Sequence, residues 1–183
     1  MLESIQTKIG FVFSDESLLE LALTHKSFDS KSNNERLEFL GDTVLNSIIS
    51  QYLFLKYPEI SEGLLSRIRS QLVKSDTLSK KAKSLKLHKA VKLSKGTLNI
   101  NDSHKKSIYE GCLEALVGAV YLDGGWDQAT LVTINIFSDE LSNISTDNSF
   151  KDPKTELQEL FQSLGMSPPE YNHEEKASGF ECT

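Results

Sequence analysis

The stretch Asn34–Leu45, NERLEFLGDTVL, decides the fold of this chain. Its apolar residues recur at helical spacing until Pro58 stops the pattern, which predicts a long helix over residues 35–57. Glu38 and Asp42 lie four residues apart within this helix and therefore on one face, which continues into apolar residues. Like charges at this spacing repel, so the pair either stays in water at the rim of the helix or shares a divalent cation.

A second acidic residue interrupts another apolar helix. Glu114 lies inside a helix predicted over residues 106–122. This helix also has residues small enough for a neighbouring helix to approach closely: Ala115, Gly118 and Ala119. If the two helices pack together, Glu38, Asp42 and Glu114 converge on one site. Such oxygen ligands suit Mg²⁺ or Mn²⁺ better than Zn²⁺, so we predict a magnesium site.

The rest of the chain predicts an all-α fold followed by a short mixed segment. No sustained strand alternation occurs before residue 150. A linker is predicted over residues 146–152, in a polar stretch with little to bury. Residues 153–183 then begin with a short amphipathic helix and continue toward a strand. Further helices are predicted after Asp15 and over 63–73, 75–85 and 126–141, with a turn at Asp123, Gly124 and Gly125.

Composition and charge narrow the class of protein. The 183 residues include only two cysteines, so a disulfide framework is excluded. The first residues do not resemble a signal peptide and no apolar run is long enough to span a membrane, so we expect a cytoplasmic protein. The net charge is −6, yet residues 64–106 hold twelve Lys and Arg against two Asp. A basic segment in an acidic chain is typical of a phosphate-binding surface beside a carboxylate centre, although a solvated lysine-rich helix face also accounts for it.

Four segments resemble blocks of the ribonuclease III family: NERLEFLGDTVL at 34–45, ALTHKSF at 22–28, LSRIRSQLV at 65–73 and, after the linker, DPKTELQELFQ at 152–162. The resemblance implies a helical nuclease domain over residues 1–145. The last block resembles the start of a double-stranded-RNA-binding domain, which residues 153–183 complete only in part. His25, in the second block, is interpreted as a structural histidine.

The resemblance also implies an activity and a set of residues. Family members hydrolyse double-stranded RNA with Mg²⁺, leave 5′-phosphates and short 3′ overhangs, act in RNA processing and form homodimers. Glu38, Asp42 and Glu114 match metal-binding carboxylates, with Asp42 and Glu114 central to catalysis. The other matched positions are Glu35 and Glu62 in the acidic cleft, Phe39 at the dimer contact and Gln158 toward RNA. Lys105 and Lys106, beside the carboxylate helix, are candidate phosphate contacts.

One departure from the family pattern concerns the metal site. The family's fourth carboxylate, three residues before the essential glutamate, falls here at Gly111, which offers no ligand. Three outcomes follow: the neighbouring Glu110 substitutes, a water fills the position, or activity is largely lost. The sequence therefore supports a metal-dependent endoribonuclease, with a non-cleaving RNA-binding or assembly protein as the alternative. A di-metal oxidoreductase bundle is excluded, because the Glu-x-x-His pattern that it needs is missing from the long helices.

Overall fold

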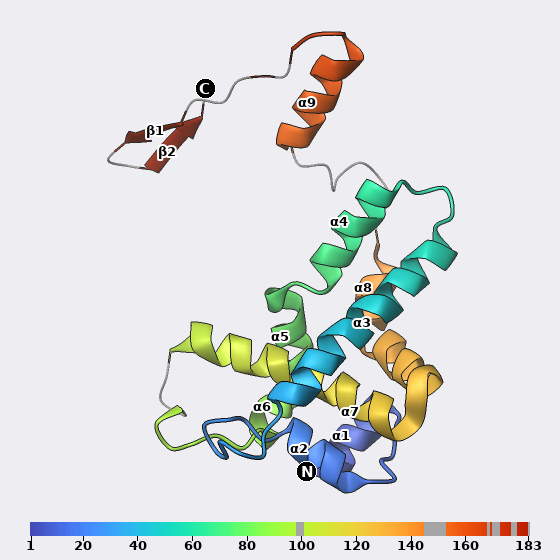
Figure 1. Cartoon of the computed structure of the whole chain (residues 1–183), viewed down its shortest axis with the longest axis vertical. Coiled ribbons are helices and arrows are strands. Elements are labelled where there is room, and N and C mark those ends of the chain that lie inside the picture. Colours follow the sequence, from blue (N-terminus) through green and yellow to red (C-terminus); the bar gives the residue numbers. More distant parts are fainter. Residues whose placement is uncertain (98–100, 145–152, 168, 170–172, 177–178, 183) are drawn as a thin grey trace. The chain divides into compact units, whose positions relative to one another are not determined.

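The long helix α3, Glu35–Lys56, runs through the centre of the helical part of the chain, as the computed structural model in Figure 1 shows. The structure describes residues 1–97, 101–144, 153–167, 169, 173–176 and 179–182. By contacts the chain divides into two compact units, Met1–Ile144 and Ser145–Thr183. The linker predicted over residues 146–152 lies outside the described residues. No helix among the described residues is both long enough and apolar enough to cross a membrane.

The first unit is all-α, which confirms the predicted fold class. Its helices are α1 (Leu2–Ile9), α2 (Glu16–Ala22), α3 (Glu35–Lys56), α4 (Glu62–Leu72), α5 (Ser75–Ser84), α6 (Leu87–Ala90), α7 (Asp102–Ile136) and α8 (Ser138–Ser142). Helix α3 makes its most extensive contact with α7, and α5 and α2 also pack on α7. The fully buried Leu45, Ile49 and Leu116 belong to this pair of central helices.

Two glycines allow α3 and α7 to cross with their backbones in contact. A Cβ atom on Gly41 of α3 would lie 1.8 Å from the carbonyl oxygen of Glu114 in α7. A Cβ atom on Gly118 would lie 2.4 Å from the carbonyl oxygen of Leu37. Real Cβ atoms do not approach other atoms so closely, so only glycine fits at these two positions. The small-residue stripe predicted on α7 is therefore used for helix packing, and it meets a matching glycine on α3.

Local signals explain where several helices begin and end. The Asp15 side chain accepts a hydrogen bond from the Ser17 backbone N–H at 2.9 Å and caps α2, as predicted. At the start of α3, the Asn33 side chain accepts the backbone N–H of Glu35 at 3.1 Å. The predicted turn before residue 126 is reduced to a kink inside α7, where Gly125 takes a positive φ of 76°.

The structure corrects the predicted elements at three places. Helices α1 and α6 were not predicted, because their apolar positions span too few turns to show a period. The helix expected over 126–141 ends at Ile136, and α8 follows after Phe137.

The second unit contains one helix and one hairpin. Helix α9, Pro153–Ser163, agrees with the predicted amphipathic helix, and Gly165 follows it with a positive φ of 69°. Strands β1 (His173–Lys176) and β2 (Gly179–Cys182) pair antiparallel, with His173 opposite Cys182. This order, a helix followed by strands, is the one expected for the start of the second domain.

Candidate active site

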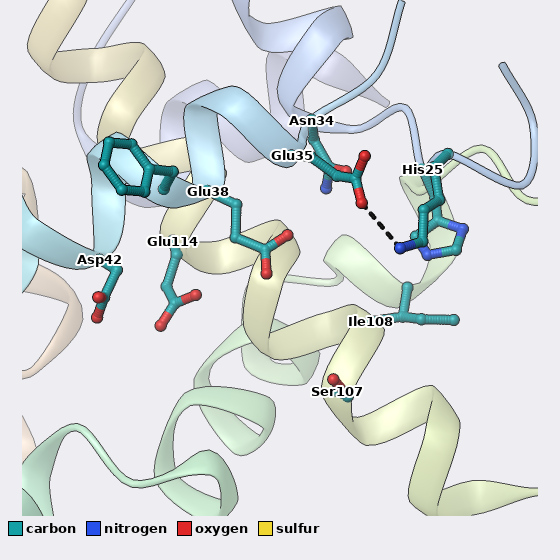
Figure 2. A pocket seen from close by; sticks show the side chains of 10 residues that line it. His25, Asn34, Glu35, Glu38, Asp42, Ser107, Ile108 and Glu114 are labelled. Atoms are coloured by element: carbon teal, nitrogen blue, oxygen red, sulfur yellow. Dashed lines mark hydrogen bonds and ion pairs between the residues drawn. The ribbon is translucent and has the colours of Figure 1, made fainter. Parts of the chain in front are cut away.

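The crossing of α3 and α7 brings the three predicted carboxylates to one place. Glu38 and Asp42 flank Gly41 on α3, and the Gly41 backbone packs against the carbonyl group of Glu114. All three side chains line a single pocket of about 490 Å³ (Figure 2). The structure therefore places the three predicted residues in the lining of one pocket. Seven further residues complete the lining: His25, Lys26, Asn34, Glu35, Phe39, Ser107 and Ile108.

The two ends of this pocket differ in chemistry. Figure 2 shows Asp42, Glu114 and Glu38 at one end and His25 with Ile108 at the other. Near His25, the Lys26 ammonium group forms an ion pair with Glu35 at 2.8 Å. The first end offers only carboxylate oxygens, whereas the second offers hydrogen-bond donors. We call these the acidic end and the donor end.

Negative charge is crowded at the acidic end. Burial, followed by the charges of Asp42, Glu110 and Glu38, raises the pKa of Glu114 to about 8. Burial and the charge of Glu35 also raise the pKa of Glu38, although Lys26 opposes this shift. Both carboxyl groups are thus costly to ionise in the protein alone, and a divalent cation between them would remove that cost.

The donor set fits magnesium or manganese in its chemistry. Glu38, Asp42 and Glu114 supply only oxygen atoms, which are the ligands that these cations prefer. Among the described residues no three acidic, histidine or cysteine side chains are gathered closely enough to form a ready metal cage. The three carboxylates therefore line the same pocket, but they are not drawn together around one point.

Glu110 and Gly111 are the two positions at which a fourth carboxylate was considered, and the structure supplies the pocket with one at neither. The Glu110 carboxylate accepts a hydrogen bond from the Ser75 hydroxyl at 2.6 Å, which ties α7 to the start of α5, and Glu110 does not line the pocket. A Cβ atom on Gly111 would lie 2.6 Å from Glu38 Oε2. The Glu38 carboxylate thus fills the space in which a side chain at position 111 would begin.

The two cleft residues implied by the resemblance lie apart. Glu35 lines the pocket at its donor end. Glu62, at the first position of α4, lines a separate groove between α3 and α4 together with Arg69, and it accepts a hydrogen bond from Ser66 at 2.8 Å. Within one copy of the chain, Glu62 is therefore not brought to the three carboxylates.

The remaining predicted residues lie outside the pocket or at its edge. Phe39 is 81% exposed and lines both this pocket and a neighbouring apolar one. Lys106 is ion-paired with Asp76 of α5, and neither Lys105 nor Lys106 lines the pocket. Gln158 lies half-buried on α9 in the second unit.

Sequence reasoning found one residue of the donor end, Glu35, and missed the others. His25 was interpreted as structural, and Lys26, Ser107 and Ile108 were not singled out. These side chains come from a loop and from α7, and their distance in sequence conceals that they share one pocket. A cationic residue beside the histidine in the block 22–28 was the one signal that could have drawn attention to them.

Comparisons with known proteins agree with this architecture. Residues 15–140 match the family model described as Ribonuclease-III-like. Ribonuclease 3 of Ectopseudomonas mendocina is 43% identical over 170 residues, which are 93% of this chain and 74% of the relative. Ribonuclease 3 of Thiobacillus denitrificans is 43% identical over 167 residues, 91% of this chain and 74% of the relative.

Solved structures show the same relationship. The nuclease domain of ribonuclease III from Campylobacter jejuni superposes with a TM-score of 0.73 at 38% identity, covering 78% of this chain and 97% of that one. Dicer from Pichia stipitis gives a TM-score of 0.56 at 27% identity, covering 93% of this chain and 80% of that one. The helical unit is thus a nuclease domain of the ribonuclease III type. The chain belongs to the ribonuclease III family, which is a family of endoribonucleases.

Proposed function

We propose that this protein is an endoribonuclease that hydrolyses double-stranded RNA with Mg²⁺, and that Mn²⁺ can replace Mg²⁺. The observation that carries the proposal is the placement of Glu38, Asp42 and Glu114 in the lining of a single pocket. The raised pKa of Glu114 supports it, because such crowding of carboxylates is costly without a cation. Relatives named ribonuclease 3 support the reaction class.

In the proposed mechanism, Glu38, Asp42 and Glu114 would hold the cation. Bound magnesium would supply an activated water and would neutralise the charge that develops on the phosphate oxygens. The protein excludes bulk water from one side of the site, because the neighbours of Glu114 in α7, such as Leu113 and Ala115, are fully buried. In the proposed reaction water attacks phosphorus, the new P–O bond replaces the P–O3′ bond, and the departing 3′-oxygen takes a proton, so that the products are a 5′-phosphate and a 3′-hydroxyl.

Basic side chains that could hold the RNA backbone occur in the segment around α5. Five lysines from just before α5 to α6 are exposed: Lys74, Lys80, Lys83, Lys86 and Lys89. Lys81 does not belong to this surface, because it is buried and pairs with Glu140 of α8. We propose that the exposed lysines hold phosphates by charge, with Lys105 beside them, and that sequence is read only weakly. Residues 153–183 resemble only the start of a double-stranded-RNA-binding domain, and of these residues we propose only Gln158 as an RNA contact.

We propose a homodimer, so that two pockets cut the two strands and leave short 3′ overhangs. Phe39 supports this, because a phenylalanine exposed to 81% is costly in water and lies beside an apolar pocket that Leu18, Leu40 and Leu122 line. The solved Campylobacter jejuni nuclease domain is described as having a region involved in dimer formation. The proposed location is the cytoplasm, with RNA processing, including that of ribosomal RNA, as the role.

Replacing Phe39 should separate the dimer. We expect Phe39→Ser to raise the dimer dissociation constant by at least about a hundredfold, because burying each of the two phenylalanine side chains is worth up to roughly 3 kcal/mol. Analytical ultracentrifugation measures this change directly. The matched control is Val12→Ser, at a residue that is 78% exposed and lines none of the three pockets described above. An unchanged dissociation constant for Phe39→Ser would show that Phe39 is not part of the dimer interface.

Substrate preference tests the proposed function. The purified protein is incubated with Mg²⁺ and labelled duplex RNA, the separate strands, or a DNA duplex of the same sequence. We expect cleavage of duplex RNA and at least about tenfold less cleavage of the other two, because recognition of A-form shape and 2′-hydroxyls requires an RNA duplex. Equal cleavage of the single strands would contradict the proposed substrate.

Gly111 decides between this function and the alternative, a non-cleaving scaffold. Because Glu38 already fills the space beside Gly111, we expect Gly111→Asp to change the cleavage rate by less than about fivefold and to lower the melting temperature without metal. Gly111→Asn controls for size without charge. A parent that binds RNA without cutting, with cleavage restored by at least about a hundredfold in Gly111→Asp, would establish the alternative.

A further inference from the structure

The donor end of the pocket contains a histidine whose two ring nitrogens have different surroundings. His25 Nδ1 accepts a hydrogen bond from the Ser27 backbone N–H at 3.1 Å and lies 2.9 Å from the Ser27 hydroxyl oxygen. That hydroxyl oxygen accepts the Ser94 backbone N–H at 3.2 Å. The Ser27 hydroxyl proton is therefore directed at Nδ1, which places the ring proton on Nε2.

Nε2–H is the polar atom of His25 that remains for a ligand. No residue in the described part of the chain accepts a hydrogen bond from it, and the ring lines the pocket opposite the acidic end (Figure 2). Burial, followed by the charge of Lys26, lowers the pKa of His25, so the ring is neutral at neutral pH. Within the described part of the chain, His25 therefore uses Nδ1 internally and leaves Nε2–H directed to the pocket.

The donor end also has a cationic side chain. The Lys26 ammonium group lines the pocket beside His25, held by its ion pair with Glu35. A strand of RNA whose scissile phosphate lies at the acidic end would place neighbouring backbone oxygens toward these donors. Phosphate oxygens and 2′-hydroxyl groups both accept hydrogen bonds, and both occur at every nucleotide.

We propose that His25 is a substrate-binding residue, whose Nε2–H donates to a backbone oxygen of the RNA strand held in the pocket, with Ser27 as the positioning residue that fixes the ring. This inference rests on the proposed function. It assigns the donor end to the nucleotide next to the cleaved bond. It also explains why a neutral donor lies in a pocket whose other end is strongly acidic: it can bind an oxygen without neutralising the carboxylates.

Two variants distinguish which ring nitrogen matters. The amide nitrogen of glutamine reaches the position of Nε2, whereas asparagine reaches that of Nδ1. We expect His25→Ala and His25→Asn to weaken binding of duplex RNA about tenfold, measured by fluorescence anisotropy in Ca²⁺, and His25→Gln to stay within about threefold of the parent. In Mg²⁺ the loss should appear mainly in KM. Ser27→Ala should give a smaller loss of the same kind.

Substituted duplexes identify the oxygen. A single 2′-deoxynucleotide or a single neutral methylphosphonate is placed at each position near the cleavage site. At the contacted oxygen, the substitution should weaken RNA binding by the parent about tenfold and should not change RNA binding by His25→Ala. The substitution that has this effect shows whether the acceptor is a 2′-hydroxyl or a phosphate.

Three results would overturn the inference. The first is that His25→Ala binds and cleaves duplex RNA as the parent does. The second is that no substituted duplex binds the parent and His25→Ala with a different loss of affinity. The third is that His25→Asn binds like the parent while His25→Ala has a lower melting temperature, as a structural role requires. In each case the parent still cuts duplex RNA and the proposed function stands. A parent that does not bind duplex RNA at all would overturn both.

Discussion

Replacing Glu114 with glutamine is expected to lower the rate of duplex RNA cleavage by at least about a thousandfold, or roughly 4 kcal/mol of transition-state stabilisation. Glutamine has nearly the same shape, so the α3–α7 crossing persists, because that contact is made by the Glu114 backbone. What is lost is one of three anionic oxygen donors on the pocket wall. Single-turnover cleavage in saturating Mg²⁺ measures the effect without the complication of product release.

The same variant should become more stable when no metal is present. The pKa of Glu114 is raised from 4.5 to about 8 in the folded protein, so its folded state holds a proton that the unfolded state releases. This favourable contribution is complete below pH 4.5 and is lost as the pH rises toward 8. Glutamine does not ionise, so Glu114→Gln should melt at a higher temperature than the parent above pH 8.

Magnesium should stabilise the parent much more than Glu114→Gln. At pH 8 the cation should raise the melting temperature of the parent, because it binds the folded carboxylates, and should leave that of Glu114→Gln nearly unchanged. Equal stabilisation of both proteins by Mg²⁺ would place the cation elsewhere. Cleavage of duplex RNA by Glu114→Gln at the rate of the parent would show that Glu114 is not needed for the reaction.

Gly41→Ala is expected to cause the largest loss of stability among single-methyl additions in this fold. The new methyl carbon would lie 1.8 Å from the Glu114 carbonyl oxygen, so α3 and α7 must move apart along their whole contact. We expect a loss of about 3 kcal/mol or more, which lowers the melting temperature by roughly 10 °C. Because Glu38 and Asp42 flank Gly41, cleavage should fall as well.

Gly63→Ala is the matched control for this effect. Gly63 is also helical, in α4, and a Cβ atom there would meet nothing within 4 Å. Alanine should leave stability unchanged or raise it slightly, since it has the higher helix propensity. Thermal unfolding of both variants by circular dichroism makes the comparison. Equal melting temperatures for the two would show that the helices do not cross at Gly41.

The central site was predictable because its residues sit on strongly periodic helices. Glu38 and Asp42 share one face by spacing alone, and Glu114 stands out within an apolar helix. Small residues on α7 indicated a close approach of another helix. The glycine that packs against α7 from α3, Gly41, could not be recognised in the sequence. A glycine inside a helix can be assigned to a helix crossing only once the opposite backbone is known.

Other features depended on contacts between distant segments. Spacing left open whether Glu110 could reach the pocket, and its hydrogen bond to Ser75, 35 residues earlier in the chain, was not visible in the sequence. The direction of His25 depends on Ser27 and on the backbone at Ser94. Glu62 lines the groove between α3 and α4 because of the direction that the chain takes between these two helices. Pattern reasoning specifies faces of helices, and it does not specify how loops and connections aim a side chain.

The most direct test of this account is to incubate the unmodified protein with an end-labelled RNA duplex in Mg²⁺, in Ca²⁺ and in chelator, beside Glu114→Gln. We predict cleavage in Mg²⁺ by the parent alone, with 5′-phosphate ends and short 3′ overhangs. RNA that is bound by the parent but left intact in Mg²⁺ and Mn²⁺, or cut equally by Glu114→Gln, would contradict it.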